Sequence, residues 1–342
     1  MSSSSSSSYV AFLNSLQIYT HRIGDSILVP FGTISCLLNL IIFTRKDFRK
    51  NPCAIYYIAY NIANLLYIYF VIFITLLQWG YYIDPGAHNI AYCRFRFYLY
   101  YLFAALSPTF LILASIDRTL ITSSTIHIRQ LSTRRLAFIV ISSMTLFWMI
   151  FHIHTLIYIN IYQLAPYYYS CSYAPGIYTT FTNYYQLVVR GLLATLLMIV
   201  FGLLTVKNIR RAHRTAAAAV PVANSAVSTI AVGHNTNYPS QKDRQFILMM
   251  CSDIIIYVFC GILRPIYMIY IQATQYQTKS DERQAIEAFI NSLTLFITFI
   301  PTCTGFYTYF LVSKSFRQNA KKVLQTNRIY NYYQLHKCTR NT

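Results

Sequence analysis

The stretch CRFRFYLYYLFAALSPTFLILASIDRT, from Cys93 to Thr119, decides the fold of this chain. It carries a largely apolar run between Cys93 at one end and the charged doublet Asp117-Arg118 at the other. As an α-helix, the interval of 25 residues that separates Cys93 from Arg118 would rise roughly 37 Å, which is enough to cross a lipid bilayer. The stretch therefore predicts a membrane-spanning helix with a thiol at one membrane face and a charge pair at the other.

The composition of the whole chain supports a membrane protein. Of its 342 residues, 56% are hydrophobic and only 11% are charged, whereas soluble domains carry about 25% charged residues. The formal net charge of +19 would suggest a nucleic-acid partner in a soluble protein, but the basic residues lie between apolar runs and form no single basic domain. We therefore expect contact with the lipid bilayer and no nucleic-acid partner.

Seven apolar runs approach or exceed the roughly 20 residues that a membrane span needs. They cover residues 27–43, 54–77, 97–116, 136–159, 184–206, 246–271 and 285–312. The fold class predicted from them is all-α, an integral membrane bundle of seven transmembrane helices. The expected organisation is a Ser-rich tail over 1–22, a helical domain over 23–312 with a long loop at about 207–245, and a tail over 313–342 with a short amphipathic helix.

The basic residues predict how the bundle is oriented. One alternating set of segments between the spans holds 21 of the 28 Lys and Arg residues, and such residues are retained on the cytoplasmic side. The N-terminus, with its Ser run expected to be disordered, is thus predicted outside and the C-terminus in the cytoplasm, in a multi-pass protein of the plasma membrane. The Ala-rich stretch 215–232 could be read as an eighth span, but Pro221, Asn224 and its basic flanks favour a loop.

Cysteine positions agree with this topology. Of eight cysteines, only Cys93 and Cys171 fall in segments predicted to lie outside the cell, where disulfides form. They are natural partners for a disulfide that would hold the second outer loop over the bundle, and two free thiols are the alternative. Lipidation of the predicted cytoplasmic Cys338 stays open.

From about Gly32 to Arg317 the chain resembles the rhodopsin-like G-protein-coupled receptors. The resemblance lies in the order and spacing of several motifs, of which Cys93 with Asp117-Arg118-Thr119 is the most specific. The other matching positions are Gly32, Asn39, the run Asn61-Ile62-Ala63-Asn64-Leu65-Leu66, Trp79-Gly80, Trp148, Cys171, Phe259, Pro265, Tyr309 and Phe316-Arg317. The chain looks like a divergent branch, similar to the expanded peptide-receptor-like sets of invertebrates.

The resemblance implies a set of residues for activation and G-protein coupling. They are Asp117, Arg118, Phe259, Pro265, Tyr309, Asn39 and Asn64. Four positions depart from the family pattern: Asn64 replaces an Asp that helps to hold sodium, Leu263 replaces a Trp, Gly305-Phe306 replaces Asn-Pro, and Ala194 replaces a Pro. These departures leave sodium dependence open and imply a variant relay between ligand and switch.

The charge doublet suggests a mechanism on physical grounds. A buried Arg118 needs Asp117 or a polar partner on another helix, since its desolvation is costly. If a ligand moves the sixth span about a kink at Pro265, Arg118 can exchange that partner for carbonyls of an intruding helix, which the resemblance implies belongs to a heterotrimeric G protein. The alternative is an interfacial pair that only anchors the helix end.

The ligand is less determined than the switch. Tyr100 stands where the amine receptors of the family keep an Asp, and the seventh span has no Lys for a Schiff base. Aromatic and positively charged residues are the candidate ligand contacts: Arg96, Tyr100, Arg190, Arg264 and Tyr267. The embedded arginines either bond between helices or meet a ligand carboxylate or carbonyl. Family frequency favours a peptide ligand.

Other functions are weaker interpretations of the sequence. We find no phosphate-binding glycine loop, zinc-protease motif or nucleophile elbow, and therefore expect neither an enzyme nor a cofactor or metal site. A seven-span transporter would be expected to show internal repeats and a channel a polar pore lining, and neither feature is evident. A receptor-like protein that no longer couples is the remaining alternative.

Overall fold

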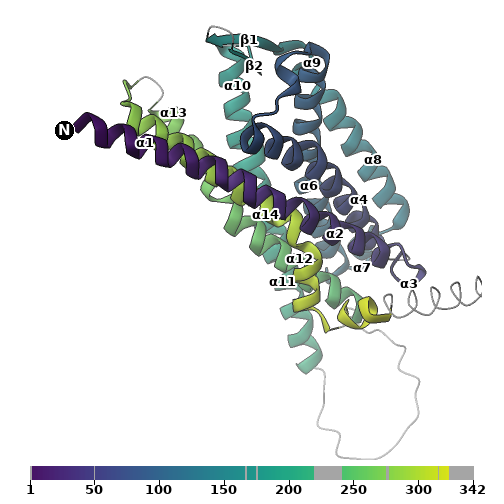
Figure 1. Ribbon diagram of the computed structural model, residues 1–342. Coiled ribbons are helices and arrows are strands. Elements are labelled where there is room, and N and C mark those ends of the chain that lie inside the picture. The colour runs from purple at the N-terminus through teal and green to yellow at the C-terminus, as the bar shows by residue number, and fades with distance from the viewer. Residues whose placement is uncertain are drawn as a thin grey trace, which may run out of the picture.

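A computed structural model describes residues 2–49, 51–165, 168–174, 176–218, 241–274, 277–314 and 316–322. Seven helical stretches of this part of the chain are long and apolar enough to cross a membrane, as the sequence predicts (Figure 1). They cover Ser8–Phe43, Pro52–Gly80, Ile90–Ile121, Arg134–Tyr158, Ile177–Arg211, Asp243–Ala273 and Asp281–Val312. Each is longer than its predicted apolar run, because polar residues extend the helices beyond the apolar segments.

The first span begins much earlier than predicted. Helix α1 (Ser2–Tyr19) runs through the π-helical turn η1 (Thr20–Asp25) into α2 (Ser26–Phe43). The Ser run, which we expected to be disordered, is therefore helical from Ser2 to Ser8. Apolar side chains of α1 give the helix a packing face, since Leu13 is buried and α1 runs along α14. The hydroxyl of Ser15 donates to the carbonyl of Ala11 one turn back, so it stays compatible with the helix.

The remaining spans are long helices with local π-helical turns. The second comprises α4 (Pro52–Tyr67), η2 (Ile68–Ile72), α5 (Phe73–Thr75) and η3 (Leu76–Gly80), and the third is α6 (Ile90–Ile121). The fourth comprises α8 (Arg134–Phe151) and α9 (Ile153–Tyr158), and the fifth α10 (Ile177–Tyr185), η5 (Gln186–Leu193) and α11 (Ala194–Ala218). The sixth comprises α12 (Gln241–Gly261) and α13 (Leu263–Ala273), and the seventh is α14 (Asp281–Val312).

Side-chain caps explain where several of these helices begin. Asn51 accepts a hydrogen bond from the backbone of Cys53 and is followed by Pro52, which suits the first turn of α4. Asn89, Thr133 and Ser280 cap α6, α8 and α14 in the same way. Local sequence therefore sets these helix starts, independently of how the helices later pack.

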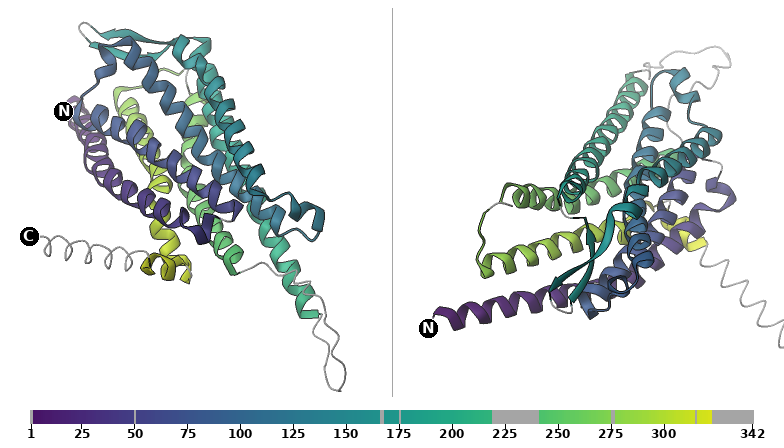
Figure 2. Two further views of the ribbon diagram at one scale, coloured as in Figure 1. Left: turned by 90° about the vertical axis from the view of Figure 1, so that its right-hand side faces the viewer. Right: turned by 90° about the horizontal axis from the view of Figure 1, so that it is seen from above.

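The two ends of the bundle differ in structure (Figures 1 and 2). One end, called here the hairpin end, carries the antiparallel strands β1 (Ile159–Ala165) and β2 (Tyr168–Tyr173) and the short helix η4 (Pro85–Ala87). The hairpin adds a small sheet to the predicted all-α fold. The opposite end, called here the α7 end, carries α3 (Lys46–Arg49) and α7 (Ile126–Gln130).

The predicted loop at 207–245 is shorter than expected. Helix α11 continues to Ala218 and α12 begins at Gln241, so both ends of that stretch are helical. The Ala-rich stretch 215–232 lies mostly outside the described residues, as do Cys338 and most of the predicted tail. Residues 316–322 are helical, in agreement with a short helix after the seventh span, and Phe316 of this helix is buried.

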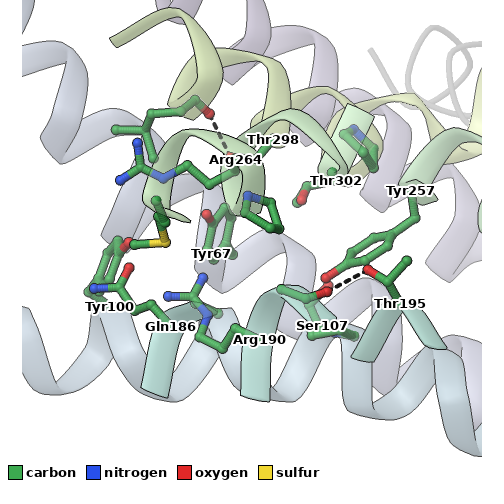
Figure 3. Close-up of a pocket in the computed structure, with 18 residues that line it drawn as sticks. Tyr67, Tyr100, Ser107, Gln186, Arg190, Thr195, Tyr257, Arg264, Thr298 and Thr302 are labelled. Carbon is green, nitrogen blue, oxygen red and sulfur yellow. Dashed lines mark hydrogen bonds between the residues drawn. The ribbon is translucent and has the colours of Figure 1, made fainter. Parts of the chain in front are cut away.

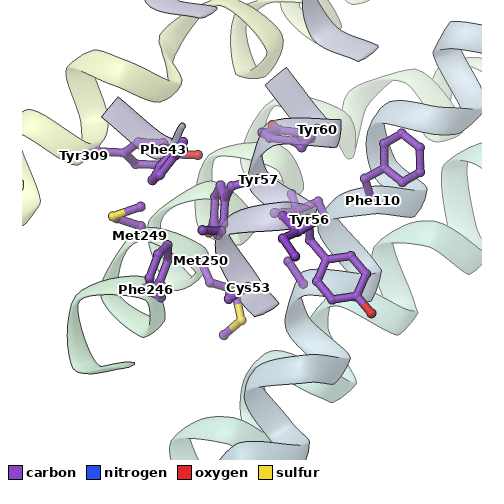
Figure 4. Packing of buried hydrophobic residues seen from close by; sticks show 14 of the residues in the cluster. Phe43, Cys53, Tyr56, Tyr57, Tyr60, Phe110, Phe246, Met249, Met250 and Tyr309 are labelled. Carbon is purple, nitrogen blue, oxygen red and sulfur yellow. The ribbon is translucent and has the colours of Figure 1, made fainter. Parts of the chain in front are cut away.

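A large buried cluster rich in aromatic side chains includes Phe48 of α3, at the α7 end (Figure 4). The ring of Tyr57 lies 5.3 Å from that of Phe43 and 5.8 Å from that of Tyr309, and Phe316 packs 5.6 Å from Tyr309 (centroid distances). These contacts join the first, second and seventh spans to the final helix. Span α6 is the most enclosed, with 72% of its most apolar window buried, so its polar residues meet other helices.

Candidate functional site

Arg118, near the α7 end of α6, is fully buried and bonded to carboxylates on two helices. Its Nη2 lies 2.6 Å from Oδ2 of the adjacent Asp117, and its Nη1 lies 2.7 Å from Oδ1 of Asp243 in the first turn of α12. The sequence predicts Asp117 or a partner on another helix, and both occur together. Two carboxylates around one guanidinium offset the desolvation that a lone buried arginine would suffer.

Neighbouring side chains complete this network. Asn51 accepts from Nη2 of Arg118 at 3.1 Å and donates to Asp243 at 3.1 Å, while the Ser132 hydroxyl donates to Asp117 at 2.6 Å. The guanidinium also lies 5.7 Å from the centroid of the Phe246 ring. Arg118 is therefore the centre of a polar contact that joins the second, third and sixth spans, called here the Arg118 network.

Asp243 falls inside the loop predicted at 207–245, and the sequence did not predict its contact with Arg118. The signal that could have found it is an isolated acid between Lys242 and Arg244 at the start of an apolar helix. An acid in the first turn of a helix also interacts favourably with the positive end of the helix dipole. The position of Asp243 therefore favours its negative charge both through Arg118 and through the dipole of α12.

A second polar contact lies deeper in the same half of the bundle. Asp253 of α12 is buried and accepts a hydrogen bond from the hydroxyl of Tyr309 on α14. Asp253 and Arg264 are 11 residues apart, about three helical turns, so the sequence predicts that both face the interior but lie too far apart to pair. Each has another partner, Tyr309 for Asp253 and Asn291 for Arg264. Asp253 and Tyr309 thus join the sixth span to the seventh.

The two predicted asparagines are buried and take part in contacts between helices. Asn39 donates to Asn61 at 3.0 Å across the first and second spans, and Asn64 accepts from the hydroxyl of Ser107 in the third. Both residues therefore connect helices near the core, where a change in helix packing would alter their hydrogen bonds.

Phe259, one of the residues expected to act in activation, lies on the outside of the bundle. Its side chain is 80% exposed on the outer surface of the sixth span, whereas Pro265 is buried. Six residues correspond to about 1.7 helical turns, so the two positions differ by about 120° around an ideal helix. Cys260, next along the chain, is buried instead. The role of Phe259 in activation stays a prediction.

Pro265 breaks the sixth span, as predicted. Helix α12 ends at Gly261 and α13 begins at Leu263, with Ile262 between them. A proline cannot donate to the carbonyl four residues earlier and its ring clashes with that carbonyl, which here belongs to Gly261. The break divides the sixth span into a segment that carries Asp243 and Asp253 and a segment that carries Arg264.

At the hairpin end, Cys93 and Cys171 form the predicted disulfide, with their Cα atoms 5.8 Å apart. The bridge ties strand β2 to the start of α6. Nearby, Nε of Arg94 donates to the carbonyl of Ile159 at 3.0 Å. These contacts hold the hairpin over this end of the bundle.

A cavity of about 100 Å³ lies between the spans, with Pro265 in its wall (Figure 3). The third, fifth, sixth and seventh spans contribute most of its walls, and the second contributes Tyr67. Of the predicted ligand contacts, Tyr100, Arg190 and Arg264 line it. Arg96 does not, because it is paired with Asp84 at 3.2 Å beside η4, and Tyr267 does not, because its hydroxyl donates to the carbonyl of Glu287.

A chain of hydroxyls connects the hairpin to this cavity. The hydroxyl of Tyr101 donates to that of Tyr173 in β2 at 2.9 Å, and Gln186, which lines the cavity, donates to Tyr101 at 3.0 Å. Burial raises the pKa of the Tyr173 hydroxyl, so it stays protonated at neutral pH. The hairpin thus reaches the cavity through neutral hydrogen bonds.

The described residues contain no group of three or more His, Cys, Asp or Glu side chains placed to hold a metal ion. Comparison with models of known protein families finds no match to this chain, and comparison with curated proteins finds none either.

Proposed function

We propose that this chain is a rhodopsin-like G-protein-coupled receptor of the plasma membrane, with its N-terminus outside and its C-terminus in the cytoplasm. In this proposal a ligand enters from the hairpin end, and a heterotrimeric G protein binds at the α7 end. The observation that carries the proposal is the Arg118 network, which ties the third span to the sixth through Asp243. Such a contact gives a bundle two discrete arrangements, one with the charge pair closed and one with it open.

Three further observations support the orientation and the role. The loops at the α7 end hold the basic residues, which favours a cytoplasmic face. The disulfide lies at the other end, which favours an oxidising compartment there. The break before Pro265 lies at the cavity, which Gly261 lines on one side of the break and Arg264 on the other, and α12 continues from there to the Arg118 network. A movement of the sixth span about this break would therefore link the cavity to the network.

The test is nucleotide exchange on purified Gα heterotrimers by the full chain in lipid nanodiscs. Because no ligand is needed for basal exchange, wild type and Arg118→Ala are compared directly across a panel of Gα classes. We expect Arg118→Ala to abolish the exchange that the wild-type protein catalyses. Arg135→Ala, which removes an exposed arginine at the same end, is the matched control and should retain it. Equal exchange by Arg118→Ala and wild type would contradict the proposal. So would ion flux through the chain when it is reconstituted into vesicles of the same lipid without any G protein.

A further inference from the structure

The cavity between the spans holds two arginines and no acid. Arg190 of η5 and Arg264 of α13 both line it, and Figure 3 shows their side chains reaching into it from two different spans. The complete set of described lining residues includes no Asp and no Glu. Two positive charges in a membrane-embedded cavity are costly unless an anion compensates them.

The contacts of the two arginines differ. Arg264 is anchored by Nη1, which donates to the backbone and side-chain oxygens of Asn291 on α14. Arg190 lies with its guanidinium 5.4 Å from the centroid of the Tyr100 ring, and its Nε is buried without a hydrogen-bond partner among the described residues. An unpaired buried N–H of a guanidinium is unfavourable, so its bonding capacity is available for a group that enters the cavity.

The rest of the lining indicates what kind of anion fits. Gln186 and Thr298 supply neutral polar groups, while Met268 and Leu295 supply apolar surface. The cavity of about 100 Å³ is somewhat smaller than the roughly 150 Å³ cavity that admits benzene. A carboxylate meets these conditions, because its planar pair of oxygens matches the guanidinium fork and the carbon atoms behind it can contact the apolar wall.

We propose that this cavity binds the carboxylate of the activating ligand between Arg190 and Arg264. The activating role of this carboxylate rests on the proposed receptor function, because the carboxylate belongs to the ligand of that receptor. The carboxylate would bridge the fifth span to α13 beside Pro265. Gly191 lies close to Pro265, since a Cβ added to Gly191 would lie 2.8 Å from Cγ of Pro265. A ligand that draws Arg190 and Arg264 together therefore acts at the break in the sixth span.

The binding experiment measures the thermal midpoint of the full chain in nanodiscs, at constant pH and ionic strength, with acetate as the probe and acetamide as its neutral isostere. At saturating acetate we expect the wild-type midpoint to rise by roughly 2 °C or more, with no comparable rise in acetamide. Equal shifts with both probes would overturn the proposal. A larger shift with inorganic phosphate than with acetate would overturn the assignment to a carboxylate.

Variants locate the effect. Arg190→Gln should weaken acetate binding about 30-fold or more and should raise the midpoint measured without acetate, because it removes an uncompensated buried charge. Arg190→Lys keeps the charge but loses the two-pronged geometry, so it should also bind acetate less well, and it serves if Arg190→Gln does not fold. Arg283→Gln, at an arginine bonded to Glu287 outside the cavity, should keep the full acetate shift. A full shift in Arg190→Gln and Arg190→Lys would refute the site.

Two further probes identify the source of the carboxylate. Stabilisation by triglycine but not by triglycine amide assigns the C-terminus of a peptide, whereas stabilisation by glutarate but not by triglycine assigns a small free acid. Neither measurement uses a G protein. If acetate binds as described while Arg118→Ala leaves nucleotide exchange unchanged, the carboxylate site stands and the receptor function fails. If acetate has no effect while Arg118→Ala abolishes nucleotide exchange, the receptor function stands and the carboxylate site fails.

Discussion

Asp243→Asn should open the Arg118 network without changing the shape of the side chain. In the structure the Asp243 carboxylate lies 2.7 Å from Nη1 of Arg118 and is 13% exposed. A hydrogen bond to a charged group contributes about 1.5–3 kcal/mol net, whereas a neutral one contributes about 0.5–1.5 kcal/mol. Asparagine can still accept from Arg118, so the expected loss is the difference, about 1–1.5 kcal/mol, and the ratio of open to closed bundles should rise roughly tenfold.

Two assays measure this change, and the first is basal nucleotide exchange on the Gα heterotrimer that gives the highest exchange with the wild-type chain in the panel proposed above. If the closed state predominates in the wild type, exchange should rise by up to about tenfold in Asp243→Asn. Asp281→Asn, at an exposed acid in the first turn of α14, is the matched control and should leave exchange unchanged.

The second assay needs no G protein. The thiol of Cys53 is fully buried beside this network, and its backbone bonds to Asn51. Alkylation of Cys53, followed by peptide mass analysis, should be faster in Asp243→Asn than in wild type. Unchanged alkylation together with unchanged exchange would refute the reasoning that Asp243 holds the sixth span closed.

Three further changes test other parts of the structure. Tyr309→Phe removes the hydroxyl that donates a hydrogen bond to the buried carboxyl group of Asp253. This loss should lower the free energy of unfolding by about 1–3 kcal/mol, which a lower thermal midpoint would show. Cys171→Ser opens a bridge between residues 78 apart, and it should reduce stability by about 4 kcal/mol on loop-closure grounds, with non-reducing peptide mapping to verify the loss. Gly32→Ala places a Cβ 2.6 Å from Sγ of Cys303 and should lower the thermal midpoint. Gly261→Ala, whose Cβ meets no atom closer than 3.9 Å, should leave the thermal midpoint unchanged.

Several features of the fold followed from local sequence. The seven spans were predicted because an apolar run of sufficient length is stable in a bilayer only as a helix. The starts of α4 and α6 could be traced to Asn51 and Asn89 as caps. The pairing of Cys93 with Cys171 followed from the topology, since the other cysteines fall outside the segments predicted to be extracellular.

Other features could not be predicted because they depend on how a helix is rotated in the bundle. Phe259 and Cys260 are neighbours in sequence, yet only Cys260 packs inward. Arg96 has the same charge as Arg190, but Asp84 holds it away from the cavity. The helical N-terminus likewise depends on a surface of α14 that supports α1.

By itself, the sequence determined the number of spans, the end of the bundle that carries the basic loops, and the presence of an arginine beside Asp117 at that end. These properties depend on residues close together in the chain. Only the tertiary structure decided that Arg118 meets Asp243, which is 125 residues away, and that Arg190 and Arg264 share one cavity. Such meetings depend on the packing and rotation of whole helices, which no single segment specifies.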